Sequence, residues 1–347
     1  MKITDGESKM MFRTALTALL ALAAAPALAN DSTAELGTGG LILSRNDVIA
    51  MQSEDLFISR EEVKVDYVFR NGSDTDITTI VAFPMPEIAG GPDLNVSIPD
   101  DTSDNFLGFS GTSDGQPIQP QLEQKAFAVG LDITAELTGH GISLNPFAEQ
   151  VYDQLEKLSD DVANEWRDRG LITINEYDDS SGWKKERTPL WELRSTYWWR
   201  ATFPAGKDVH VSHSYKPSVG GTAGLSFFYD GQFQGDYDDY KGRYCIDSGF
   251  ENAVRKAAKA NGDSFPPYSE SRIDYVLTTG GNWALGSIGK FRLTIDKGDA
   301  KSIVSFCGTG VKKIGPTTFQ MEAENFYPEQ DIEILFLDTW SDEGGPQ

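Results

Sequence analysis

The sequence has 347 residues, of which 39% are hydrophobic and 24% are charged, and this composition excludes a disordered or fibrous chain. Its 53 acidic residues outnumber its 30 basic residues, which gives a formal net charge of -23 at pH 7. A surface with this charge repels polyanions, so the composition argues against a nucleic-acid-binding protein.

The first 29 residues have the pattern of a secretory signal peptide. Lys9 and Arg13 precede an apolar run over residues 15–28, which is shorter than the roughly 20 residues that a membrane-spanning helix needs. The run ends in Ala27-Leu28-Ala29, a small-x-small pattern typical of cleavage sites. No later stretch is long and apolar enough to span a membrane. We therefore expect cleavage near Ala29 and a periplasmic or secreted mature chain without a transmembrane span.

Residues 30–140 are dominated by strand patterns. Residues 63–69 alternate apolar and polar side chains, and a turn-forming cluster at residues 71–74 separates them from a second run at residues 77–83. Two such runs joined by a short polar turn predict an antiparallel hairpin. We expect an N-terminal β-sandwich over residues 30–140.

Residues 141–190 interrupt the strand patterns with a helical connection. Apolar residues recur at helical spacing from Phe147 to Trp166, with Pro146 at the expected first turn and Gly170 just past the end. This pattern predicts one amphipathic helix over about residues 145–169. Its apolar face could dock a partner, but a helix that packs on its own domain is the commoner arrangement.

Strand patterns return at residue 191 and continue to residue 340. A second helix is predicted over about residues 248–261, and Asn261-Gly262 ends its pattern. The expected fold is therefore mainly β, with two β-sandwich-like units, the second over residues 191–340, and two helical insertions. The small and polar residues 341–347 predict a disordered tail.

Cys245 and Cys307 are the two cysteines of the chain. An even number in an exported protein favours one disulfide bond over a metal site or a catalytic thiol. The alternative, in which one of them acts as a nucleophile, stays open. It has no supporting motif, because neither cysteine has a histidine or a second cysteine at motif spacing.

Five short segments carry a family resemblance. They are NDSTAELGTGGL at residues 30–41, EEVKVDYVFRN at 61–71, VAFPMP at 81–86, YVLTTGGNW at 275–283 and IGKF at 288–291. These segments resemble a bacterial exported family catalogued as domain of unknown function 4424, and the resemblance covers nearly the whole chain after residue 29. It implies export and a β-rich fold. It implies no catalytic residue, because the family has no established activity.

The acidic segment at residues 230–240 is the best candidate for a metal site. Its candidate ligands are Asp230, Asp236, Asp238 and Asp239, and crowded carboxylates on a Gly-rich loop suit Ca²⁺. Their spacing does not match the twelve-residue calcium loop, and a solvated acidic loop is the commoner reason for such a run. We therefore expect no cofactor, with a Ca²⁺ site at these residues as the alternative.

Other catalytic signatures are weak. His210 and His213 lie in a predicted strand, where a separation of three places them on opposite faces, so they do not predict a zinc site. The chain contains no Gly-x-Ser-x-Gly motif of a serine hydrolase. Its many acidic residues supply carboxylate pairs of the kind that glycosidases use, but the sequence does not rank them.

Aromatic residues gather between residues 183 and 199. Trp183, Trp191 and Trp198 lie near lysines and arginines, and exposed aromatic rings with charged neighbours can stack on sugars or hold the side chains of a partner. The alternative is that these tryptophans fill the core. We take the three as candidate ligand-binding residues.

These observations favour a binding protein over an enzyme. We expect an exported, non-enzymatic envelope protein that binds a periplasmic protein or a glycan, because sandwich-like folds commonly serve recognition and no nucleophile or cofactor motif is present. The alternative is an exported hydrolase that acts on polysaccharide through paired carboxylates.

Overall fold

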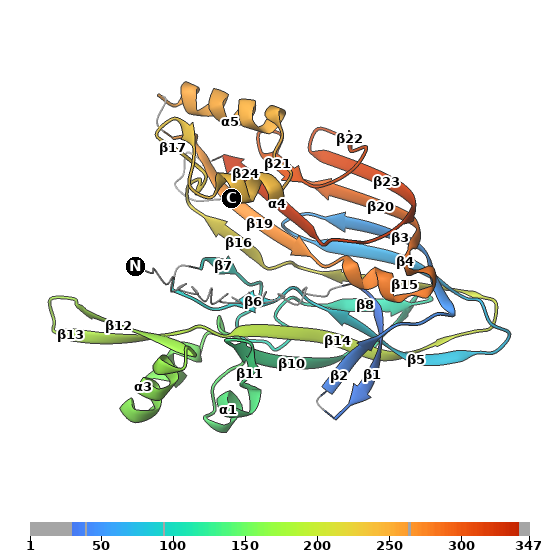
Figure 1. Ribbon diagram of the computed structural model, residues 1–347, viewed down its shortest axis with the longest axis horizontal. Helices are drawn as coiled ribbons and strands as arrows, with labels where there is room; N and C mark the ends of the chain where they lie inside the picture. Colours follow the sequence, from blue (N-terminus) through green and yellow to red (C-terminus); the bar gives the residue numbers. More distant parts are fainter. Residues whose placement is uncertain (1–29, 39, 93, 263–264, 340–347) are drawn as a thin grey trace, which may run out of the picture.

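The computed structural model describes residues 30–38, 40–92, 94–262 and 265–339. The predicted signal peptide, residues 1–29, and the predicted tail, residues 341–347, lie outside the described residues. The protein is mainly β, as predicted, and three large sheets form its body (Figure 1). No helix of the described ranges is long and apolar enough to cross a membrane.

The largest sheet has eight strands in the order β22-β23-β20-β3-β4-β15-β8-β9. β20 runs parallel to β3, whereas β3 and β4 pair in the antiparallel sense. The strands are β3 (Ile49–Ile58), β4 (Val63–Asn71), β8 (Ser110–Ser113), β9 (Gln116–Pro117), β15 (Asp208–Tyr215), β20 (Ile288–Asp296), β22 (Lys312–Lys313) and β23 (Thr318–Phe326).

Two further sheets pack with it. The seven-stranded sheet has the order β11-β10-β14-β5-β1-β2, with β6 paired to β14, and the five-stranded sheet has the order β21-β24-β19-β16-β7. The first contains β1 (Ser32–Gly37), β2 (Gly40–Ser44), β5 (Ile77–Pro84), β6 (Ile88–Ala89), β10 (Gln121–Ala128), β11 (Leu131–Asp132) and β14 (Glu192–Phe203). The second contains β7 (Val96–Ser97), β16 (Val219–Thr222), β19 (Tyr268–Tyr275), β21 (Ile303–Phe306) and β24 (Ile332–Thr339).

The predicted units at residues 30–140 and 191–340 do not correspond to separate sheets. β3 and β4 from the first unit pair with β20 and β15 from the second, and β5 pairs with β14. Alternation along one strand shows which side chains are buried but not which strand lies beside it. The two halves of the sequence are therefore interleaved in one structure.

The predicted hairpin of residues 63–83 is wrong. β4 belongs to the eight-stranded sheet and β5 to the seven-stranded sheet, so the turn between them carries the chain from one sheet to another. The buried Asn71 side chain holds this crossing, because its amide donates hydrogen bonds of 2.8 Å to the carbonyls of Thr75 and Phe203. A polar turn between two strands fits a sheet-to-sheet connection as well as a hairpin.

One hydrophobic core joins the three large sheets. Phe83 comes from the seven-stranded sheet, Phe69 from the eight-stranded sheet and Phe336 from the five-stranded sheet, and each is fully buried. The alternation predicted for residues 63–69 is confirmed, since Val63 and every second residue to Phe69 are buried while Lys64 is exposed. This shared core places the three sheets in fixed contact.

The helices lie outside the sheets (Figure 1). In place of the single helix predicted at 145–169 there are two, α2 (Val151–Glu156) and α3 (Asp160–Asp168). The helical structure is interrupted before Ser159, whose hydroxyl caps α3 by accepting a hydrogen bond from the backbone N–H of Val162. The second predicted helix is confirmed as α5 (Ser248–Ala260).

Several short elements were not predicted. They are the helices α1 (Thr134–Gly139) and α4 (Tyr237–Arg243), the turns η1 (Thr278–Asn282) and η2 (Ala284–Gly286), and the hairpin of β12 (Ile172–Asp178) with β13 (Trp183–Pro189). A strand was expected at β17 (Phe228–Tyr229), but not its short hairpin with β18 (Gln232–Phe233). Elements of this length bury few side chains and give little periodic signal. Three of them contain predicted site residues, namely α4, the β12–β13 hairpin and the β17–β18 hairpin.

Candidate functional site

The β12–β13 hairpin projects from the body of the protein (Figure 1). At its free end Tyr177 lies opposite Lys184, and Asp178 lies opposite Trp183. We call these four residues the hairpin tip. The side chain of Trp183 is 77% exposed and that of Tyr177 is 42% exposed. Large aromatic surfaces exposed at the end of a projection are typical of a contact surface.

The base of the hairpin is fixed to the helices. The Arg187 guanidinium is buried, and its Nη1 donates hydrogen bonds of 2.8 Å to the carbonyls of Leu155 and Leu158. Its Nη2 lies 2.9 Å from a carboxylate oxygen of Asp160. These carbonyls lie at and just beyond the C-terminal end of α2, where a helix leaves carbonyls without internal partners. Arg187 thus joins the hairpin to α2 and α3, and the tip extends from a rigid base.

The structure does not bring the three candidate tryptophans together. Trp191 is fully buried, and its indole N–H donates a hydrogen bond of 2.8 Å to the carbonyl of Leu144. Trp198 is partly buried and packs against a small apolar cluster that includes Ala82. Trp191 is therefore a core residue that a ligand does not reach in this fold. Of the three, Trp183 has its aromatic face open to solvent.

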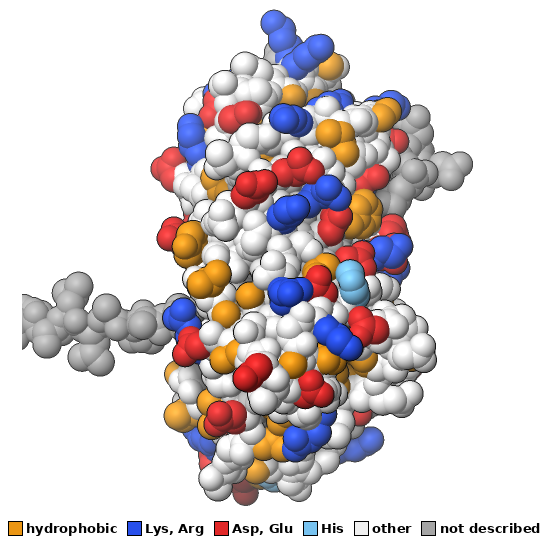
Figure 2. Space-filling view, turned by 90° about the vertical axis from the view of Figure 1, so that its right-hand side faces the viewer, with side chains coloured by type: hydrophobic (Ala, Val, Ile, Leu, Met, Phe, Trp, Pro, Cys, Tyr) orange, Lys and Arg blue, Asp and Glu red, His pale blue; other side chains and the backbone are white. Residues whose placement is uncertain are grey.

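The opposite end of the molecule looks different. In the face that Figure 2 shows, basic and acidic side chains are interspersed, and apolar side chains are scattered between them. Such mixed surfaces are ordinary for a globular protein and single apolar residues on them need no explanation.

The acidic segment is mostly ordered secondary structure. Asp230 forms the turn between β17 and β18, Asp236 precedes α4, and Asp238 and Asp239 lie in the first turn of that helix. Acidic side chains are favourable there because the N-terminal end of a helix carries positive partial charge. All four side chains are exposed. In the part of the chain that the structure describes, no group of three or more His, Cys, Asp or Glu residues could hold a metal ion.

The histidines of β15 lie on opposite faces of the strand, as predicted. His210 is exposed, and His213 is buried in the core. A single metal ion therefore cannot bind both side chains.

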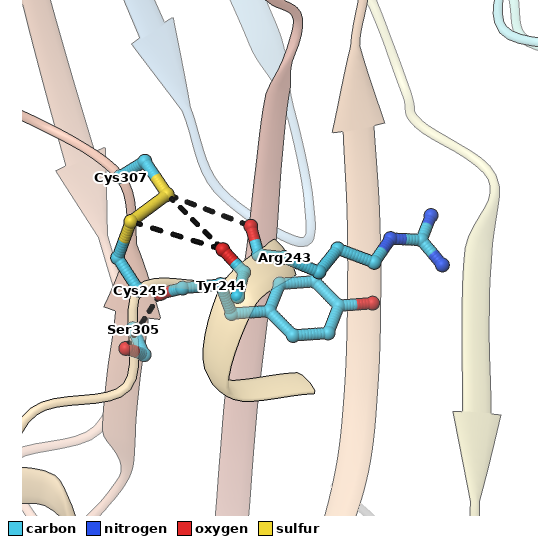
Figure 3. The surroundings of a disulfide bond; sticks show 6 residues. Arg243, Tyr244, Cys245, Ser305 and Cys307 are labelled. Carbon is cyan, nitrogen blue, oxygen red and sulfur yellow. Dashed lines mark hydrogen bonds between the residues drawn. A yellow bond between two sulfur atoms is a disulfide. The ribbon is translucent and has the colours of Figure 1, made fainter. Parts of the chain in front are cut away.

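Cys245 and Cys307 form a disulfide bond (Figure 3), so the predicted pairing is confirmed. Cys245 follows α4 and Cys307 follows β21, and the bond ties this helix to an edge strand of the five-stranded sheet. Beside it, the Ser305 hydroxyl donates a hydrogen bond of 2.9 Å to the carbonyl of Tyr244. Because both sulfurs are bonded, neither is available as the nucleophile of the alternative.

A carboxylate pair lies on the outer side of the five-stranded sheet. Asp274 and Glu333 are directly opposite each other on β19 and β24. Arg243 lies between them, with its guanidinium 3.6 Å from Asp274 and 2.9 Å from Glu333. Partial removal from water raises the pKa of both carboxyls, and Arg243 opposes this rise. The pair is a candidate for the paired carboxylates of a hydrolase, but both members already bind one guanidinium.

The comparisons with known proteins give a family and no activity. A family model described as a domain of unknown function, DUF4424, matches residues 29–335. No curated protein matches the chain.

Two solved structures show remote similarity. One, described as "a putative nutrient binding protein" from Legionella pneumophila, is 14% identical over 89% of this chain and 70% of its own, with a TM-score of 0.40. The other, a mutant of a two-domain M1 zinc metallopeptidase bound to L-tryptophan, is 8% identical over 85% of this chain and 44% of its own, with a TM-score of 0.20. Similarities this low carry no functional argument.

Proposed function

The chain belongs to the DUF4424 family, and from this premise we propose that it is an exported, non-enzymatic envelope protein that binds a partner through the hairpin tip. The observation that carries the proposal is the exposed ring of Trp183 at the end of a projection whose base Arg187 fixes. Export is supported by the signal-peptide pattern before Asn30 and by the disulfide, since disulfides persist in oxidising compartments.

A protein is the partner that the hairpin favours. Within the described ranges, β12 and β13 pair with each other and with no further strand. The outer edges of the exposed part of the hairpin therefore offer backbone N–H and C=O groups to a strand of the partner. Charges of both signs flank the tip, with Lys185 paired to Glu176 at 3.2 Å, and this mixture suits a polypeptide surface. A glycan stacked on Trp183 is the other outcome that the experiment distinguishes.

A photocrosslinking amino acid placed at position 183 tests the proposal in living cells. We expect an adduct of discrete mass in the envelope fraction. The same amino acid at position 327 is the control, because Tyr327 is aromatic, 60% exposed and outside the hairpin. Peptides of a second protein in the purified adduct identify a protein partner, and carbohydrate attached to the bait peptide that contains position 183 identifies a glycan. Equal adducts at both positions, or none at 183, would refute the proposal.

The purified Trp183→Ala variant gives a quantitative check once the adduct is identified. We expect its melting temperature to match the wild type, because an exposed side chain contributes little to stability. Its affinity for the identified partner should fall by about tenfold or more, which is typical of tryptophan contacts. Tyr327→Ala should bind as the wild type does.

One specific observation supports the hydrolase alternative, namely the carboxylate pair of Asp274 and Glu333. It predicts turnover of an envelope polysaccharide that Glu333→Gln abolishes and Trp183→Ala leaves intact. That result would favour the enzyme over the binding protein.

A further inference from the structure

A polar cluster lies inside the core that the three large sheets share. Asn30 and Asp31 are fully buried, and Glu54 is 1% exposed. The cluster contains two acids, and two of its members, Tyr67 and Tyr275, belong to the shared hydrophobic core. Its other members are Tyr67 on β4, His213 on β15, Tyr275 on β19 and Thr279 in η1.

Asn30 is held by contacts from several elements. Its backbone nitrogen donates a hydrogen bond of 2.6 Å to Thr279 Oγ1, and that hydroxyl donates one of 2.7 Å to the Asn30 carbonyl. The Asn30 side chain donates to Glu54 at 3.0 Å and accepts from the Tyr67 hydroxyl. A Cβ at Gly280 would lie 2.7 Å from Asn30 Nδ2, so glycine permits this close approach. The position of the Asn30 nitrogen is therefore closely defined.

Within the described residues, no lysine or arginine forms an ion pair with either acid of the cluster. Both carboxylate oxygens of Asp31 are buried without a hydrogen-bond partner among the described residues. His213 Nδ1 lies 3.7 Å from one of them, but burial lowers the pKa of His213 to about 3, so this imidazole is neutral at pH 7. Burial also raises the pKa of Asp31 and raises that of Glu54 to about 8. A buried carboxyl in such a place needs either a proton or a cation.

We propose that the cation that balances Asp31 is the α-ammonium group of Asn30, which proteolytic removal of residues 1–29 creates. Hydrolysis of the Ala29–Asn30 peptide bond consumes one water, whose oxygen enters the Ala29 carboxylate, and the freed amine takes up a proton. The ammonium has three N–H donors. Thr279 Oγ1 accepts one of them, and the others are available to Asp31.

Two further observations agree with this assignment. The family match begins at residue 29, beside the predicted cleavage site. Of the segments that carry the family resemblance, residues 30–41, 61–71 and 275–283 meet at the cluster, and Trp283 donates from its indole N–H to the Asp31 carbonyl at 2.6 Å. These segments surround the first residues of the mature chain, and they lie in the core rather than at the hairpin tip. The inference rests on export but not on the binding role of the hairpin.

A four-residue insertion tests whether the charge of the Asn30 α-amine stabilises the protein, because it removes that charge and leaves the sequence from Asn30 onward unchanged. Gly-Ser-Gly-Ser placed between Ala29 and Asn30 keeps the cleavage pattern and turns the Asn30 amine into a neutral amide. We expect the exported and processed variant to melt about 5 °C or more below the wild type, because a buried carboxylate has lost its charge partner. Intact mass of both mature proteins defines their first residues.

Side-chain variants test whether the loss depends on Asp31. In an Asp31→Asn background the insertion should lower the melting temperature by less than half as much, because the charge that the ammonium balances is gone. Two control backgrounds are Asp47→Asn, which changes an exposed carboxylate, and Glu54→Gln. In both, the insertion should still lower the melting temperature by most of the amount seen in the wild type. An equal loss in the Asp31→Asn and Asp47→Asn backgrounds, or a loss that only Glu54→Gln removes, overturns the pairing with Asp31.

Chemical labelling provides a readout without mutation. In the native wild-type protein the α-amine should react with an acylating reagent at least roughly tenfold more slowly than in the urea-unfolded chain, after correction for a lysine peptide. A mature chain that begins elsewhere than Asn30 overturns both the processing step and the inference. A chain that begins at Asn30 with a freely reactive amine overturns the inference alone.

Discussion

His213 shows how the position of one residue on a strand determines whether its side chain can carry charge. The imidazole packs against aromatic rings on several strands, and neither ring nitrogen has a hydrogen-bond partner within the described part of the protein. The sequence predicted that His210 and His213 face opposite sides. It did not predict which of them enters the core, because that depends on the sheet packed against β15. The rings around His213 belong to Tyr67, Phe83, Phe109 and Trp199.

The buried imidazole predicts a specific pH dependence of stability. Between pH 3 and 6.5 the unfolded chain binds a proton at this site that the folded protein does not, so the free energy of unfolding falls as the pH falls. From pH 7 to pH 5 the loss due to His213 should be about 2 kcal/mol. Urea unfolding at both pH values should show that the free energy of unfolding changes by about 2 kcal/mol more unfavourably in the wild type than in His213→Leu on going from pH 7 to pH 5. The comparison is a difference because Glu54, whose raised pKa has the opposite effect on stability, titrates in both proteins. His210→Leu controls for removal of a histidine from the same strand, and equal pH dependences of wild type and His213→Leu would contradict the prediction.

At the scale of secondary-structure elements, periodicity located the helices better than it located their ends. The stripe from Phe147 to Trp166 correctly indicated helical structure, but Ser159 offers a cap in its middle and the chain divides there into α2 and α3. The end of α2 is also stabilised by the buried Arg187, which donates hydrogen bonds to the carbonyls there and lies about 30 residues further along the sequence. A partner that comes from a distant strand leaves no mark in the local pattern.

The disulfide connects two secondary-structure elements, since it joins the end of α4 to the end of β21. Cys245 and Cys307 are 62 residues apart, and closing a loop of that length in the unfolded chain stabilises the folded state by about 4 kcal/mol in the chain-entropy model. We therefore expect dithiothreitol to lower the urea midpoint of the wild type to that of the Cys245→Ala/Cys307→Ala variant. The variant itself should not respond to the reductant. A wild-type midpoint that stays constant while mass spectrometry shows two reduced thiols would disprove this contribution.

For the whole molecule, composition and strand alternation predicted the mainly β class, but not how the strands are shared among sheets. β3 and β20 lie side by side although more than half of the chain separates them. No local feature of either segment specifies this parallel pair, because pairing depends on which faces become buried together. The candidate site could be predicted only in part for the same reason. Trp183 was among the predicted residues, but the hairpin that carries it is held in place by contacts of Arg187 with α2 and α3, which come from another part of the sequence.

Interleaving of the halves predicts that the protein unfolds as one unit. A fragment of residues 30–140 keeps β3, β4 and β5 but lacks β20, β15 and β14, so apolar faces that these neighbours cover would meet water. We expect this fragment to lack near-ultraviolet circular dichroism, and the full mature chain to show coincident urea transitions by far-ultraviolet circular dichroism and tryptophan fluorescence. A fragment with its own sigmoidal transition, matched by a separate step in the full chain, would instead divide the protein into the two units that the sequence alone predicted.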